Sequence, residues 1–240
     1  GVLRALAALD DHGRAGQLQL GGVLREVVLD LPQQVRLGVR PDGSVDLELQ
    51  LTLRGLPAAQ VRQRLDEAQA RKERLEQDLN ARFPGLRLTE VQAEGITPLA
   101  DEVRVRVRGL VPQWAQSAAG SLTLLPVYGG GSYVQTLASL PKRQHDLVLD
   151  HATLETTTVR ISPPAGLAAT KLPPAVELPG PAGARFGLSA RHDGAVVEWN
   201  LRLQLPSRRL AVADYPAWRA WLASVDAALR SEVVLAGVGR

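Results

Sequence analysis

Four side chains in the middle of the chain could together bind a metal ion. His145, Asp146, Asp150 and His151 lie within seven residues, and imidazole nitrogens and carboxylate oxygens are common ligands of zinc and other divalent ions. If the segment is a strand, however, the two histidines lie roughly 20 Å apart at about 3.3 Å per residue, too far to share one ion. We therefore interpret the segment as a strand between the histidines. A metal-dependent hydrolase is the alternative, and it requires a loop here.

Two further sets of residues are candidates for binding. Arg104, Arg106 and Arg108 alternate with valines, so they share one strand face that could contact an acidic partner, although such a face is commonly just solvated. Tyr128 and Tyr133 flank a run of glycines and are similar to aromatic residues that stack on sugars, which gives a carbohydrate- or peptidoglycan-binding module as a further alternative. The glycine run is followed by no Lys-Ser or Lys-Thr, so it does not indicate a phosphate loop. We predict no catalytic residue and no cofactor.

Composition excludes several classes of function. The 240 residues include no Cys, which rules out disulfides, thiolate metal sites and cysteine nucleophiles in this chain. The net charge is only +3, and acidic residues are interspersed with the basic ones, which argues against a nucleic-acid partner. No apolar run reaches the roughly 18 to 20 residues of a membrane helix. Because the chain also lacks Met, we expect it to be a C-terminal piece of a larger protein.

Alternating apolar and polar residues predict several antiparallel strands. The longest pattern runs from Val45 to Leu53, and the turn sequence at 41–44 before it predicts a hairpin with the preceding segment. Similar patterns cover 103–107, 122–124 and 197–205, and the turn at 192–194 pairs the last of these with 186–190. A mainly β protein follows.

Two segments have helical periodicity instead. Apolar residues recur every three or four positions in a long amphipathic helix over 57–83, which Pro84-Gly85 ends. The second helix covers 214–232, with Asp214 as N-cap and Trp218 and Trp221 on a face that we expect to pack in the core. We place a domain boundary after residue 140, giving a β-sandwich-like domain at 1–140 with an inserted helix and a smaller β domain at 141–240 closed by the C-terminal helix.

The order of these segments resembles the non-catalytic region that follows the transglutaminase-like domain in bacterial proteins with an N-terminal β-rich domain of unknown function. Three places carry the resemblance, which extends from roughly Leu9 to Leu235: Gly55 before a helix containing Arg62, the Arg143 to Leu149 segment followed by Leu172-Pro173, and Val212 to Arg219 with Asp226 and Val233 to Leu235.

The resemblance implies a companion module without catalytic residues of its own. The enzymatic part of such proteins is a papain-like Cys, His and Asp set, and this chain contains no Cys. We therefore expect a mainly β fold of antiparallel sandwich-like units that makes protein–protein contacts, with the catalytic portion of the same parent protein as a partner. The expected location is the periplasm or cell envelope of a Gram-negative bacterium.

Overall fold

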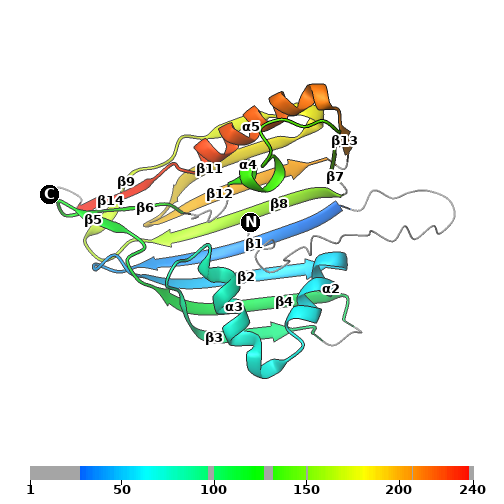
Figure 1. Ribbon diagram of the computed structural model, residues 1–240. Helices are drawn as coiled ribbons and strands as arrows, with labels where there is room; N and C mark the ends of the chain where they lie inside the picture. Colours follow the sequence, from blue (N-terminus) through cyan, green and yellow to red (C-terminus); the bar gives the residue numbers. More distant parts are fainter. Residues whose placement is uncertain (1–27, 97–99, 127–131, 150, 207, 238–240) are drawn as a thin grey trace.

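The centre of the protein is an eight-stranded sheet (Figure 1). The computed structural model describes residues 28–96, 100–126, 132–149, 151–206 and 208–237. The strand order is β10-β11-β12-β8-β1-β2-β4-β3. The strands are β1 (Val28–Val39), β2 (Val45–Arg54), β3 (Arg87–Glu94), β4 (Glu102–Val111), β8 (Ala152–Ser162), β10 (Val176–Pro179), β11 (Arg185–Asp193) and β12 (Val196–Leu205).

The predicted hairpins are confirmed. β1 pairs antiparallel with β2 through the turn at 41–44. In this turn Gly43 has a φ of 81°, and a Cβ atom added to Gly43 would lie 2.4 Å from the Ala115 carbonyl oxygen. Glycine alone fits that position, because it combines a left-handed backbone with a close approach. β11 pairs antiparallel with β12 through the turn at Gly194. The mainly β prediction is therefore confirmed.

One face of this sheet is buried and the other is open. Along β2, the alternate residues Val45 to Leu53 are at most 2% exposed, while the residues between them are half-buried or exposed. The same alternation continues across β1, β4, β8 and β12, and most of the buried apolar residues of these strands belong to one hydrophobic cluster. We call the second face, which carries the alternating polar residues of these strands, the open face.

The predicted helix over 57–83 is interrupted. The structure has α2 (Gly55–Arg64), a short 3₁₀ turn η1 (Ala68–Ala70) and α3 (Arg71–Asn80). Two arginines of α3 reach back to the end of α2: Arg71 Nε donates to the Leu65 carbonyl at 2.5 Å, and Arg74 Nη1 donates to the Arg64 carbonyl at 2.9 Å. These side chains satisfy carbonyls that a continuous helix would have used internally. α2 and α3 still lie over the β1–β4 part of the sheet (Figure 1).

The C-terminal helix is confirmed as α5 (Tyr215–Ala228), preceded by the 3₁₀ turn η3 (Val212–Asp214). Asp214 makes no side-chain cap hydrogen bond, contrary to expectation. Trp218 and Trp221 are 0% and 7% exposed with ring centroids 5.3 Å apart, so the expected core packing is also confirmed. Trp221 Nε1 donates to the Leu178 carbonyl of β10 at 3.1 Å, which fixes α5 to the edge of the sheet.

Smaller elements complete the fold. A four-stranded sheet has the order β5 (Gln116–Ala118), β6 (Ser121–Leu124), β14 (Val233–Gly237), β9 (Leu167–Lys171), and β13 (Arg208–Leu210) pairs with β7 (Leu147–Leu149). The short helix α4 (Tyr133–Leu137) lies beside α5, and the 3₁₀ turn η2 (Pro181–Gly183) connects β10 to β11. In the part of the chain that the structure describes, no helix is long and apolar enough to cross a membrane.

The large sheet continues across the predicted boundary at residue 140. β1 pairs in parallel with β8, from Val28 opposite Ala152 to Gly38 opposite Ser162. The same sheet therefore contains strands from both sides of residue 140, and the boundary does not divide it in two. Sequence alternation alone could not show this, because it gives the faces of a strand and not its partner.

Candidate functional site

A single row of charged residues crosses the open face. The row contains one residue from each of seven neighbouring strands, and each residue is the register partner of the next: Arg191, Glu198, Arg160, Arg36, Glu48, Arg108 and Glu90. Directly opposed side chains on one face lie about 5 Å apart, so opposite charges there attract. Signs alternate along the row except at its centre, where two arginines are neighbours across the parallel pair β1–β8.

Arginines gather around three glutamates on this face. Glu48 binds Arg36, Arg106 and Arg108, with N–O distances of 3.6, 2.7 and 3.1 Å. The other two glutamates each bind two arginines, Glu102 with Arg54 and Arg104, and Glu198 with Arg160 and Arg191.

The arginines form the outer layer of the open face. The side chains of Glu48, Glu102 and Glu198 are only 15–19% exposed, whereas those of the seven arginines around them are 38–78% exposed. Around these three glutamates, an approaching molecule therefore meets guanidinium groups before carboxylates.

These contacts keep the glutamates ionised. Burial acts to raise the pKa of Glu48, but the hydrogen bonds and positive charges of Arg106 and Arg108 together outweigh it and leave the pKa below its ordinary value. The hydrogen bond from Arg54 lowers the pKa of Glu102, and the hydrogen bond from Arg191 lowers the pKa of Glu198. The ion pairs therefore persist through the neutral pH range.

The three arginines predicted as binding candidates all lie on the open face. Arg106 and Arg108 bind Glu48, Arg108 also binds Glu90 at 3.1 Å, and Arg104 binds Glu102 at 2.6 Å. The sequence pattern placed them on one strand face, as the structure does. It missed Arg36, Arg160 and Arg191, which come from other strands, because register is needed to bring them into the same row.

The segment from His145 to His151 contains the strand β7, as the alternation predicts. Asp146 lies just before β7 and accepts a hydrogen bond from the Val212 backbone amide at 3.1 Å, with Arg209 Nη1 at 3.8 Å. His145 is exposed, and Asp150 lies outside the described residues. Among the residues that the structure describes, no group of three or more His, Cys, Asp or Glu side chains is arranged to hold a metal ion.

Of the two tyrosines proposed for stacking, Tyr128 lies outside the described residues. Tyr133 is half-buried against the core at the start of α4, and its hydroxyl donates to Glu155 Oε2 at 2.9 Å. The Asp226 carboxylate of α5 accepts from the backbone amides of Tyr133 at 2.7 Å and Val134 at 3.1 Å and caps α4 from a distance in sequence. Sugar binding by either tyrosine stays a prediction.

A buried polar cluster lies on the covered face of the sheet. Arg82 Nη1 donates to Gln33 Oε1 at 2.9 Å, and Gln33 Nε2 donates to Glu155 Oε1 at 3.5 Å. Arg82, Gln33 and Glu155 are at most 9% exposed. Burial lowers the pKa of Arg82 to about 10, although the negative charge of Glu155 acts to raise it. This cluster links the end of α3 to β1 and β8, and through Tyr133 to α4. It therefore connects the pair of helices α2 and α3 to the pair α4 and α5.

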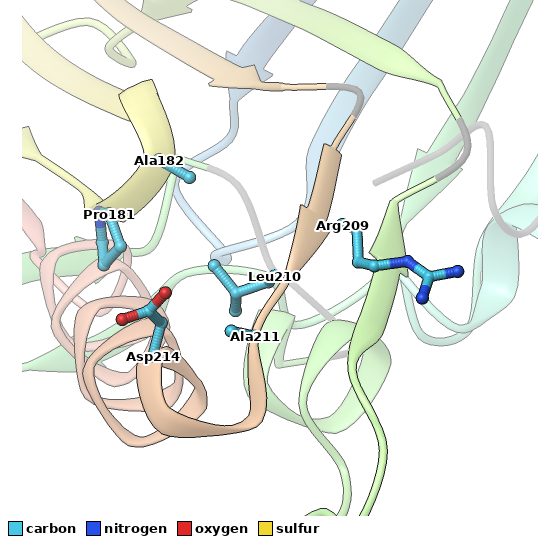
Figure 2. Close-up of a pocket in the computed structure, with 6 residues that line it drawn as sticks. All are labelled: Pro181, Ala182, Arg209, Leu210, Ala211 and Asp214. Atoms are coloured by element: carbon cyan, nitrogen blue, oxygen red, sulfur yellow. The ribbon is translucent and has the colours of Figure 1, made fainter.

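A shallow pocket with a volume of about 360 Å³ lies beside the start of α5 (Figure 2). Its lining residues come from η2, β13, η3 and the residue between β13 and η3: Pro181, Ala182, Arg209, Leu210, Ala211 and Asp214. The Arg209 guanidinium points away from Asp214 in this view.

Two of the three segments that carry the transglutaminase-associated resemblance, those at 143–149 and 212–219, pack against each other. Tyr215 Oη donates to the Leu140 carbonyl at 2.6 Å, and the Arg143 guanidinium lies 5.7 Å from the centre of the Tyr215 ring. Together with the contact between Asp146 and Val212, these interactions hold the 140–146 segment to the start of α5.

Comparison with known proteins identifies one region of similarity. Residues 122–235 match the model of a family described as a domain of unknown function with a solved structure, DUF3858. The matched region begins within β6 and ends within β14, two strands that pair with each other, and it includes β8 but not β1 to β4. No curated protein matches the chain.

Proposed function

We propose that this chain is a non-catalytic interaction module whose open face docks a protein partner. The observation that carries the proposal is the arginine-rich outer layer on one face of a sheet whose other face packs in the protein interior. Arginine is enriched in protein interfaces because its planar guanidinium forms bidentate hydrogen bonds and stacks on flat groups.

The partner that we propose is a transglutaminase-like domain of the same parent protein, in the envelope of a Gram-negative bacterium. The support is the resemblance in three segments, two of which pack together at the start of α5. The match of residues 122–235 to a domain of unknown function agrees with a module of this kind but assigns it no partner.

The experiment is site-specific photocrosslinking of the native protein in its source organism. Gln50 lies on the open face between the arginines and is uncharged, so a photoreactive residue there leaves the ion pairs intact. Gln77, exposed on α3 on the covered side, is the matched control. We expect a crosslink from position 50 and none from position 77, to a Cys-containing transglutaminase-like polypeptide identified by mass spectrometry.

Two results would contradict the proposal. Equal crosslinking from both positions would show that the open face is not the docking surface. A crosslink from position 50 to an unrelated polypeptide would reject the transglutaminase-like domain as the partner, but it would still support a role of this chain as an interaction module.

A further inference from the structure

The centre of the open face differs from its surroundings. Over residues 32–38, β1 places Pro32, Gln34, Arg36 and Gly38 there, and the paired stretch 156–162 of β8 places Thr156, Thr158, Arg160 and Ser162 there. We call these residues the seam. The seam contains two arginines and no acidic residue, whereas the strands on both sides carry glutamates opposite their arginines.

The two seam arginines are attached to carboxylates on opposite sides. Arg160 donates through Nη1 to Glu198 at 3.1 Å and through Nη2 to Asp193, both on the β11–β12 side. Arg36 lies 3.6 Å from Glu48 on the β2 side. No carboxylate of the described residues lies between the two arginines in register, so positive charge is concentrated along the seam.

Arg36 is the less neutralised of the two. Glu48 accepts its short hydrogen bonds from Arg106 and Arg108, at 2.7 to 3.1 Å, and contacts Arg36 only as a looser ion pair. The Arg36 side chain is also 65% exposed. Asp46, opposite Gly38 on β2, is already bound by Arg40 at 2.6 and 2.9 Å. A guanidinium with hydrogen-bonding capacity left is therefore available at the centre of the face.

We infer that the seam binds a carboxylate side chain of the partner protein, held between Arg36 and Arg160. The inference rests on the proposed function and specifies its partner: a surface of mixed charge with an acidic residue at its centre. Neighbouring strands lie about 4.8 Å apart, so the two oxygens of one carboxylate can each accept from one guanidinium. Gln34, exposed beside Arg36 on the seam, supplies a further amide donor.

A polyanion such as a nucleic acid or polyphosphate fits the face less well. Its regularly spaced phosphates would extend beyond the seam and meet Glu90, Glu94 and Asp193, whose side chains are 39–71% exposed. Like charges across an interface are costly and select against such partners. An isolated carboxylate with mixed neighbours avoids that repulsion.

The test is an NMR titration of the arginine Nε–H resonances of the full chain. The probes are the capped dipeptide acetyl-Glu-Glu-amide, the neutral acetyl-Gln-Gln-amide and tripolyphosphate. We expect the acidic dipeptide to give saturable shifts at Arg36 and Arg160, at least threefold weaker binding in Arg36→Gln, and unchanged binding in the control Arg54→Gln, which removes an arginine that is 78% exposed at Glu102. The neutral dipeptide should give no saturable shifts at either arginine.

Three outcomes would overturn the inference. These are the absence of saturable shifts, equal shifts at all arginines, and tighter binding of tripolyphosphate at the same two side chains. Photocrosslinking from position 50 in the Arg36→Gln variant separates this inference from the proposed function. An undiminished crosslink in that variant would reject carboxylate binding at the seam but would still support docking on the open face. The absence of a crosslink even in the parent protein would reject docking on the open face itself.

Discussion

Glu155 is the residue whose replacement tests the buried polar cluster most directly. Its carboxylate accepts hydrogen bonds from Tyr133 at 2.9 Å and Gln33 at 3.5 Å, and it provides the negative charge that faces the buried Arg82. Glu155→Gln keeps the shape and an acceptor for the tyrosine but removes the charge. The guanidinium of Arg82 then remains buried without a compensating carboxylate.

The expected magnitude follows from the burial of Arg82. A pKa lowered to about 10 means that the fold already holds this cation at a cost of about 3 kcal/mol, even with Glu155 charged. Removing one partner of a buried pair costs about 3–5 kcal/mol. Because Gln33 separates the two charges here, we expect Glu155→Gln to lower the free energy of unfolding by about 2 kcal/mol. In Arg82→Met plus Glu155→Gln both charges are gone, and the double variant should unfold within about 1 kcal/mol of the parent protein.

The assay is urea unfolding followed by circular dichroism for the parent protein, both single variants and the double variant. The resulting cycle should give a coupling energy of about 2 kcal/mol between the two positions. Additive effects, within about 0.5 kcal/mol, would refute the reasoning, because they would mean that the two charges do not interact in the fold. Equal m-values across the four proteins would show that the comparison concerns the same unfolding transition.

Three further changes have expected outcomes. Glu48→Gln should cost about 1 kcal/mol at pH 7. Since the fold lowers the pKa of Glu48 from its ordinary value of 4.5, unfolding at several pH values should show that the difference from the parent protein starts to shrink below that value and is lost only as pH falls through the lowered pKa. Asp226→Ala leaves the Ser132 cap of α4 but removes the carboxylate that accepts from the first amides of this helix, so it should cost about 1–2 kcal/mol and accelerate hydrogen exchange at the Tyr133 amide; unchanged exchange would contradict this role. Gly180→Ala would place a Cβ 2.5 Å from the Trp221 ring, and a thermal melt should show a loss of about 1–3 kcal/mol.

The sequence predicted the elements of this fold better than their arrangement. The alternation from Val45 to Leu53 and from Val197 to Leu205 corresponds to β2 and β12, and the turns before these strands were located correctly. The prediction of one continuous helix over 57–83 was wrong. Apolar spacing does not reveal that the side chains of Arg71 and Arg74 bind the carbonyls at the end of α2, where the helix is interrupted. Parallel pairing of β1 with β8 leaves no local signal at all.

The candidate site was predictable only in part. The period of two in Arg104, Arg106 and Arg108 correctly put three arginines on one face of a strand. The glutamates that organise them lie on other strands: Arg106 and Glu48 are 58 residues apart in sequence, and Arg160 and Glu198 are 38 apart. Such pairs depend on register between distant strands, which a single sequence does not give. The buried cluster was missed for the same reason, because Gln33 and Arg82 are ordinary surface residue types when considered alone.

The parallel pairing of β1 with β8 also affects how the chain can fold. Gln33 and Glu155 meet across this pair although 122 residues separate them, so closing the sheet brings together distant parts of the chain, at an entropic cost of about 4 kcal/mol by loop-closure scaling. The hairpins β1–β2 and β11–β12 can form earlier, because their contacts are local. Until the sheet closes, β1 and β8 both present unpaired edges, and two molecules at high concentration can exchange halves through them. The pairing that unites the sheet is therefore also its route to a domain-swapped dimer.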